Sequence, residues 1–179
     1  MRIVLIGIQG SGKSTQGDLL SKKFSIPFFS SGDIFRTLAK EETDLGKYIK
    51  EVMNSGLLIP DDKTIAIITE YLSRPEYKNG YILDGFPRTI IQAEQFKNGV
   101  DFTIYLKVSD EEALHRISLR KSARQDETTS AIRKRIELFH THTEPLLDFY
   151  RKDNKLIEID GEQDIEAIHK QILASLGVA

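Results

Sequence analysis

The sequence contains no cysteine. Disulfide bonds and cysteine-ligated zinc sites are therefore both excluded. The chain also lacks an excess of either charge, because 25 lysines and arginines stand against 27 aspartates and glutamates and give a net charge of −2 at pH 7. A protein that binds nucleic acid regardless of its sequence needs a broad basic surface. We therefore expect no nucleic-acid partner.

Long apolar runs and flexible linkers are also missing. The apolar start of the chain ends at Ile6, before Gly7, and is too short for a signal peptide or a membrane span. We therefore expect a cytoplasmic protein with no membrane partner. No linker rich in proline, glycine or serine and no internal repeat divides the 179 residues. This length, with 40% hydrophobic residues, suits one α/β domain with a sizeable core.

Strand-like and helix-like segments alternate along the chain. Continuous apolar runs predict strands over residues 1–6, 26–30, 80–84, 102–108 and 156–159. Apolar residues at helical spacing predict helices over 13–24, 31–39, 44–54, 60–72, 90–96, 110–119, 130–150 and 165–176, the long one interrupted near Pro145. Thr89 and Asp110 are the expected N-caps of their helices. The alternation predicts a five-stranded parallel sheet with helices on both faces.

A glycine-rich stretch follows the first predicted strand. Residues 7–15 fit the pattern G-x-x-x-x-G-K-[ST], in which a loop between a strand and a helix holds phosphate groups. Its backbone N–H groups and the start of the helix attract anions. Lys13 would reach the outer phosphates, and the Ser14 hydroxyl suits Mg²⁺. The stretch predicts a nucleoside-triphosphate site in a phosphate-loop NTPase fold.

Asp84 ends the predicted strand over residues 80–84. Sites in parallel sheets lie at the carboxyl ends of the strands, so we expect Asp84 beside the phosphate loop. A carboxylate there can hold Mg²⁺ or its water ligands. The alternative is an aspartate that only caps a loop or helix. These two motifs alone leave the reaction open.

Several arginines narrow the choice. Arg116 and Arg120 lie four residues apart, at the end of the helix predicted over residues 110–119 and directly after it. Like charges at this helical spacing repel, and a bound anion would relieve this repulsion. Arg88 follows a Gly-Phe-Pro loop, and Arg124 and Arg135 bracket a polar segment. For any single arginine, a solvated basic face is the alternative interpretation. As a group they are suited to a phosphoryl group in transfer, because the planar guanidinium donates two parallel hydrogen bonds.

Longer strings carry a family resemblance. They are Gly-x-x-Gly-x-Gly-Lys-x-Thr-Gln, Ser-Gly-Asp-Ile-Phe-Arg, Gly-Leu-Leu-Ile-Pro-Asp and Tyr-Ile-Leu-Asp-Gly-Phe-Pro-Arg-Thr. Together with Gln92 they resemble the adenylate kinase family of nucleoside monophosphate kinases. The resemblance covers nearly the whole chain, and the Asp-Gly-Phe-Pro-Arg string is its most specific part. It implies reversible, Mg²⁺-dependent phosphoryl transfer from ATP to AMP, which gives two ADP.

The resemblance also implies the residues of two nucleotide sites. Those for ATP are Gly10, Ser11, Gly12, Lys13, Ser14, Thr15, Arg116, Arg120 and Gln163. Those for AMP are Ser31, Arg36, Met53, Leu57, Ile59, Gly85, Arg88, Gln92, Arg124 and Arg135. The implied catalytic cations are Lys13, Arg88, Arg120, Arg124 and Arg135, and the implied Mg²⁺ residues are Ser14 and Asp84, directly or through water.

The resemblance implies a division of the chain into three parts. Residues 1–29, 60–119 and 128–179 would form the core, and residues 30–59 a helical AMP-binding insertion. Residues 120–127 would be a lid of the short type, without a zinc-bearing insertion. We expect a monomer, because each part would have to move freely.

The acceptor base is a separate question. The Gln92 amide can donate to adenine N1 and accept from the exocyclic amino group, whereas pyrimidine-specific relatives usually carry Asn there and Ala at the place of Ser31. AMP is therefore the expected acceptor, and a UMP/CMP kinase is the alternative. A nucleotide-binding regulatory module without turnover is a further alternative, against which the full set of cations argues. The reaction needs no side chain to remove a proton from the acceptor. The second pKa of a phosphate monoester is about 6, so the acceptor oxygen is already largely ionised at neutral pH.

The sequence departs from the usual family pattern at four positions. Gln9 replaces proline and Ser14 replaces glycine in the phosphate loop, and Ala123 and Glu127 replace glycine and aspartate near the lid. Ser14 makes the loop resemble a general phosphate loop, in which this hydroxyl contacts the metal. We interpret the four changes as tuning of the same activity.

Overall fold

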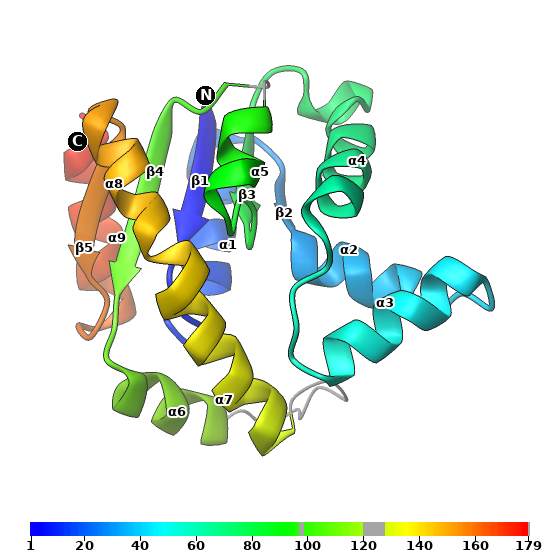
Figure 1. Cartoon of the computed structure of the whole chain (residues 1–179). Helices are drawn as coiled ribbons and strands as arrows, with labels where there is room; N and C mark the ends of the chain where they lie inside the picture. Colours follow the sequence, from blue (N-terminus) through cyan, green and yellow to red (C-terminus); the bar gives the residue numbers. More distant parts are fainter. Residues whose placement is uncertain (97–98, 120–127, 179) are drawn as a thin grey trace.

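The computed structural model describes residues 1–96, 99–119 and 128–178, and Figure 1 shows the arrangement of their helices and strands. The strands are β1 (Arg2–Ile6), β2 (Phe28–Ser30), β3 (Tyr81–Asp84), β4 (Phe102–Lys107) and β5 (Leu156–Asp160). The α-helices are α1 (Lys13–Phe24), α2 (Ser31–Leu38), α3 (Asp44–Asn54), α4 (Asp61–Leu72), α5 (Ile90–Gln95), α6 (Asp110–Ser118), α7 (Thr129–Leu138), α8 (Pro145–Lys152) and α9 (Ile165–Ser175). Short turns of other helix types are η1 (Pro75–Tyr77) and η2 (Phe139–Thr143).

The described strands form one parallel sheet in the order β2-β3-β1-β4-β5. The first strand lies in the middle, where Val4 pairs with Leu83 on one side and with Thr103 on the other. All five strands run in the same direction, so their carboxyl ends meet at one edge of the sheet. The predicted fold class is confirmed.

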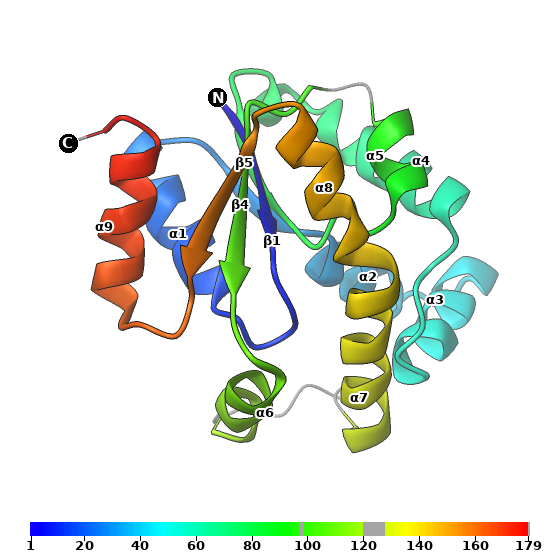
Figure 2. The same cartoon turned by 60° about the vertical axis from the view of Figure 1, so that its left-hand side comes forward.

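The two faces of the sheet carry separate hydrophobic clusters. Ile3 and Leu5 pack into one cluster, and Val4 and Ile6 pack into the other, because successive side chains of a strand point to opposite faces. Helices α1 and α9 cover the first face, and α5 and α8 cover the second, as Figure 2 shows. Burial on both faces explains why the strand sequences are continuously apolar.

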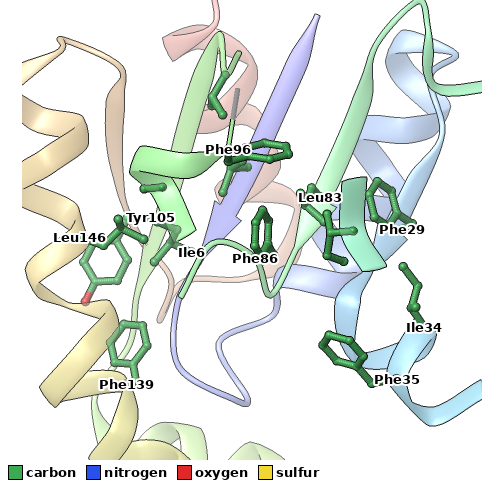
Figure 3. Packing of buried hydrophobic residues seen from close by; sticks show 14 of the residues in the cluster. Ile6, Phe29, Ile34, Phe35, Leu83, Phe86, Phe96, Tyr105, Phe139 and Leu146 are labelled. Atoms are coloured by element: carbon green, nitrogen blue, oxygen red, sulfur yellow. The ribbon is translucent and has the colours of Figure 1, made fainter. Parts of the chain in front are cut away.

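Aromatic side chains anchor the loop that follows β3. Phe86 is 1% exposed, and its ring meets the edge of Phe96 with 5.0 Å between ring centroids. Figure 3 shows this pair beside Leu83 in the cluster. Full burial of a phenylalanine side chain contributes about 2–3 kcal/mol of transfer free energy. The polar residues after Phe86 are therefore attached to a fixed point.

The long helix expected over residues 130–150 is divided. Helix α7 ends at Leu138, a π-helical segment covers Phe139–Thr143, and α8 begins at Pro145. A proline has no N–H and its ring crowds the preceding turn. The hydrogen bond from Glu144 N to Phe139 O (2.8 Å) shows the wider turn that results.

Of the two predicted helix N-caps, the one for α5 is confirmed and the one for α6 is wrong. Thr89 caps α5 by accepting a hydrogen bond from Gln92 N. The cap of α6 is Ser109, which accepts from Glu112 N, and not Asp110, which is the first helical residue. Asp110 still lies in the first turn, where a negative charge is favourable.

Helices α2 and α3 project from the side of the sheet next to β2 (Figure 1). The chain leaves the sheet at Ser30 and returns through α4 to the helices that pack on the sheet. Leu45, Tyr48 and Leu57 in this excursion are 38–48% exposed. In the described part of the chain, no helix combines the length and apolar character needed to cross a membrane.

Candidate active site

The phosphate loop connects β1 to α1 and depends on two left-handed glycines. Gly10 has φ +96°, and a Cβ there would lie 2.6 Å from the carbonyl oxygen of Ala113 in α6. Gly12 has φ +91° and is the N-cap of α1. A side chain is disfavoured at both positions, because L-residues rarely adopt this backbone conformation. The loop therefore curls tightly against α6 and leads into the helix start.

Lys13 lies along the inside of this loop. Its Nζ donates to Gly7 O (2.7 Å), Ile8 O (2.9 Å) and the Ser11 hydroxyl (3.3 Å). The same atom is 3.9 Å from Asp84 Oδ1. The loop thus presents an ammonium group together with the start of α1, two features that both attract anionic phosphates.

Asp84 ends β3 beside the loop, as the sequence predicts. It is 6% exposed, and its Oδ1 accepts no hydrogen bond from any described residue. The Ser14 hydroxyl donates to its other oxygen at 3.5 Å. A buried carboxylate oxygen without a donor loses its hydration. This oxygen and the Ser14 hydroxyl are hard ligands, and this donor set fits Mg²⁺ or its water ligands.

Cations gather on the opposite side of the site. Burial is the main cause of the lowered pKa of Arg88, and the Asp84 carboxylate opposes this shift. The charges of Arg135 and Arg36 lower the pKa of Arg88 further. A guanidinium remains charged at neutral pH. The arrangement therefore concentrates positive charge at one place, which an anionic phosphate would neutralise.

Each of these arginines is held by a neighbour. Arg88 Nε donates to Gly85 O (2.7 Å), and Arg135 Nη2 donates to Met53 O (2.9 Å). Arg135 also reaches the Gln9 side chain at 3.4 Å, and Arg36 pairs with Asp33 one turn earlier in α2. Arg135 thus joins α7, α3 and the phosphate loop.

The loop after β3 is fixed from two further elements. Ser31, fully buried at the start of α2, donates to Gly85 O (2.8 Å). Thr143, in η2, donates to Arg88 O (2.9 Å). Hydrogen bonds between such distant segments fix the backbone from which the Arg88 side chain extends.

Gln92 occupies a defined orientation behind this loop. Its Oε1 accepts from Arg88 N (2.7 Å), and its Nε2 donates to Asp61 Oδ1 (2.8 Å). Asp61 is the first residue of α4 and also accepts from the Thr89 hydroxyl (3.0 Å). Gln92 itself is 2% exposed.

One cavity of about 900 Å³ connects these groups. On the side of the phosphate loop its lining includes the predicted residues Gly10, Ser11, Gly12, Lys13, Ser14, Thr15, Asp84, Arg116 and Gln163. On the other side it includes Arg36, Met53, Leu57, Ile59, Gly85, Arg88, Gln92 and Arg135. Residues of both predicted sets therefore line the same cavity.

The predicted residues differ in how they relate to this cavity. Ser31 is not among the lining residues and acts through its hydrogen bond to Gly85. Arg116 pairs with Glu112 (2.6 Å), and Gln163 donates to Asp160 (3.1 Å). Arg120 and Arg124, like Ala123, Glu127 and the rest of the expected lid, lie outside the described residues.

Sequence reasoning did not select three polar residues that shape the site. Thr64 is buried in α4 and donates to Ile59 O (3.1 Å), and it lines the cavity, as does Thr143. Asp61 holds Gln92. Thr64 and Thr143 occupy inward helical positions where apolar residues are usual, and that pattern is the signal they offered. Asp61 resembled an ordinary first-turn acid.

The fold and the phosphate loop together define the class of protein. A parallel sheet whose first strand leads through this loop into a helix is a phosphate-loop nucleotide-binding protein. The family model described as adenylate kinase matches residues 5–155. The chain belongs to the adenylate kinase family and is a phosphotransferase.

Curated relatives agree along the whole chain. It is 37% identical to the adenylate kinase of Caldicellulosiruptor bescii over 214 positions, which cover 99% of this chain and 100% of that protein. It is 33% identical to that of Bacillus velezensis (99% and 98% covered) and 34% identical to that of Archaeoglobus fulgidus (98% and 98%). A chain of 179 residues cannot fill 214 aligned positions, so it lacks at least 35 positions of the first relative.

Proposed function

We propose that this protein transfers a phosphoryl group reversibly between ATP and AMP to give two ADP. The observation that carries the proposal is the cavity with two groups of cations facing it. Lys13 and the start of α1 lie on one side, and Arg88, Arg36 and Arg135 lie on the other. A single nucleotide phosphate chain would not require both groups, whereas a donor and an acceptor would.

The residues suit a transfer that needs positioning and charge neutralisation more than proton removal. The acceptor oxygen of a nucleoside monophosphate is already largely ionised at neutral pH, because its second pKa is about 6. The phosphate loop would hold the donor, and Arg88 would hold the acceptor phosphate in line with it. Lys13 and the arginines would stabilise the negative charge that spreads over the transferring group.

The Mg²⁺ requirement is part of the same proposal. The Ser14 hydroxyl and Asp84, with its oxygen lacking a hydrogen-bond donor among the described residues, would hold the ion or its water ligands. When bound with ATP, Mg²⁺ supplies charge neutralisation between the phosphates. Ser14 then has a use in this chain that the glycine usual in the family cannot provide.

We also propose three parts that move relative to one another. Residues 1–29, 60–119 and 128–179 would form the core, and residues 30–59 would carry one wall of the acceptor site. The family resemblance assigns a short lid to residues 120–127, which lie outside the described residues. A short lid would account for positions that this chain lacks relative to the Caldicellulosiruptor bescii protein. Closure would exclude water, which otherwise competes with AMP as the acceptor. We expect the protein to act as a monomer.

A coupled assay of ADP formation tests the function. Mg²⁺ and ATP are supplied with AMP, UMP, CMP or GMP in turn, and a reaction without acceptor measures hydrolysis. We expect ADP to form rapidly with AMP and at a rate at least tenfold lower with the others. A preference for UMP or CMP would contradict the acceptor assignment. Tight ATP binding with no transfer to any acceptor would overturn the proposed activity and indicate a binding module.

A further inference from the structure

Asp61 is the residue on which the further inference rests. It is the first residue of α4, and its Oδ1 accepts two hydrogen bonds from α5 and its cap, one from Gln92 Nε2 (2.8 Å) and one from Thr89 (3.0 Å). Its neighbour Asp62 is exposed, and no hydrogen bond or ion pair joins it to another described residue. Two adjacent acids at one helix start thus have different surroundings.

The contacts of Gln92 assign the two ends of its amide. The backbone N–H of Arg88 can only donate, so the atom that it contacts at 2.7 Å is the amide oxygen. The carboxylate of Asp61 can only accept, so the atom at 2.8 Å is the amide nitrogen. Rotating the amide by 180° would set donor against donor and oxygen against oxygen. Both contacts oppose this rotation.

The amide still has one group of each kind to offer. The oxygen has a second lone pair and the nitrogen a second hydrogen, which the hydrogen bonds of the described residues leave open. Gln92 lines the cavity together with Met53, Leu57 and Ile59. A nucleobase in that part of the cavity would meet an acceptor and a donor in a fixed order.

We propose that Asp61 is a positioning residue that makes this site select 6-amino purines over 6-oxo purines. Adenine presents a ring acceptor at N1 beside an exocyclic N–H donor, which matches the fixed amide. Hypoxanthine and guanine present N1–H beside a carbonyl oxygen, which is the reverse pattern and would match only the rotated amide. By the same chemistry cytosine fits the fixed amide better than uracil does.

This inference rests on the proposed function, because it assumes that a nucleoside monophosphate occupies this side of the cavity. AMP and inosine monophosphate (IMP) are the sharpest pair of probes, since the two bases have the same shape and differ in the 6-amino and 6-oxo groups. A site built to hydrogen-bond one pattern rejects the other strongly. We expect the unmodified protein to prefer AMP over IMP by at least about 100-fold in kcat/KM.

Three variants separate the role of Asp61 from general effects. Asp61→Ala removes the hydrogen-bond acceptor of the Gln92 amide. We expect the AMP-to-IMP ratio, which is kcat/KM for AMP divided by kcat/KM for IMP, to fall by roughly tenfold, the factor that corresponds to one hydrogen bond to a charged group. Asp61→Asn keeps an oxygen at the same position and should hold the ratio within about threefold of the unmodified protein. Asp62→Ala removes the adjacent acid of the same helix turn and should leave the ratio unchanged.

The measurements distinguish failure of this inference from failure of the proposed function. Dissociation constants for AMP and IMP are measured by calorimetry, which needs no turnover, and kcat/KM is measured by the coupled assay. Absence of AMP turnover in the unmodified protein would overturn the proposed function. An unchanged AMP-to-IMP ratio in Asp61→Ala, with normal AMP turnover in the unmodified protein, would overturn the role of Asp61 alone.

Thermal unfolding of each variant accompanies these measurements. A merely structural role would lower stability and all rates together, and it would leave the AMP-to-IMP ratio unaltered. Should Asp61→Ala not fold, Asp61→Ser takes its place, because serine keeps a polar side chain at this position while its hydroxyl is shorter than the carboxylate that reaches Gln92. If the AMP-to-IMP ratio fell in Asp61→Asn as far as in Asp61→Ala, this result would contradict the role of Asp61 as a hydrogen-bond acceptor.

Discussion

The two sides of the cavity are built in different ways. The phosphate loop is one continuous stretch of the chain, and its groups are mostly backbone atoms placed by β1, α1 and two left-handed glycines. The opposite side collects single side chains from α2, α4, the loop after β3, α5 and α7. A contiguous motif fixes its own geometry, whereas a dispersed one depends on every contact between its elements.

This difference has a consequence for substitutions. A substitution in the phosphate loop affects mainly the loop itself, because the loop is held by its own backbone and by its contact with α6. On the other side, Arg88 depends on Gly85, Ser31 and Thr143, each from a different element. A change at any of them would move the same guanidinium.

The largest effect is expected from the local side. Lys13→Met keeps the length of the side chain and removes the ammonium group that lies inside the loop. We expect kcat/KM for ADP formation to fall by roughly 1,000-fold, as when a preorganised donor to a developing negative charge is lost. Lys22→Met, at an exposed position of the same helix, is the control. A loss below tenfold would contradict the role assigned to Lys13.

Arg88→Ala tests the dispersed side. It removes the guanidinium at the centre of the arginine group while leaving the phosphate loop intact. We expect kcat to fall by roughly 100-fold or more and ATP affinity to change by less than about threefold. Arg74→Ala, whose guanidinium stacks on Tyr71 at 3.9 Å, is the matched control. An equal loss of ATP affinity would show that the two sides are not separate.

Asp84→Asn addresses the residue that borders both sides. The substitution preserves shape and removes the charge next to Lys13 and Ser14. We expect the Mg²⁺ concentration for half-maximal rate to rise about tenfold, which is the lower end for loss of a metal-supporting carboxylate. Binding of ATP without Mg²⁺ should not weaken. An unchanged Mg²⁺ requirement would remove Asp84 from the metal site.

The smallest effect is expected outside both sides, at His140. Its ring bridges Glu144 and Asp110, each at 2.9 Å, and these hydrogen bonds raise its pKa above 6.5. A raised pKa in the folded state means that the stabilisation is complete below about pH 6.5 and is lost as the pH rises through the folded-state pKa. Glu144 is the larger cause of the shift.

His140→Gln should therefore lower the melting temperature at pH 6 and leave it nearly unchanged at pH 9. The side chain is 45% exposed, so the difference should not exceed about 3 °C, the shift that corresponds to an exposed ion pair in a chain of this size. Thermal unfolding at both values of pH, with His115→Gln as the control, makes the measurement. A loss of stability equal at pH 6 and pH 9 would contradict the protonated bridge.

The fold followed closely from the sequence because its signals are local. Continuous apolar runs identified the strands, and helical spacing identified α3 with its observed bounds, Asp44–Asn54. The wrong N-cap of α6 lies where neighbours compete, because Ser109 and Asp110 are both good caps. The interruption expected near Pro145 is confirmed, and its form, the turn Phe139–Thr143, is seen only in the structure.

The sequence by itself determined the chemistry that consecutive residues create. The phosphate loop of residues 7–15, with Lys13 and Ser14, could be predicted because its spacing specifies a backbone shape and leaves little to distant contacts. The family strings added the residues of the acceptor side, but not what holds them in place.

Only the tertiary structure decided how the separated groups face one another. The contact of Asp61 with Gln92 crosses 31 residues of sequence, and that of Thr143 with Arg88 crosses 55. No periodic pattern in the sequence indicates either contact, because both arise from the packing of α4, α5 and η2 on one face of the sheet. The direction of one buried amide, and the base that it would accept, therefore could not be inferred from the order of residues alone.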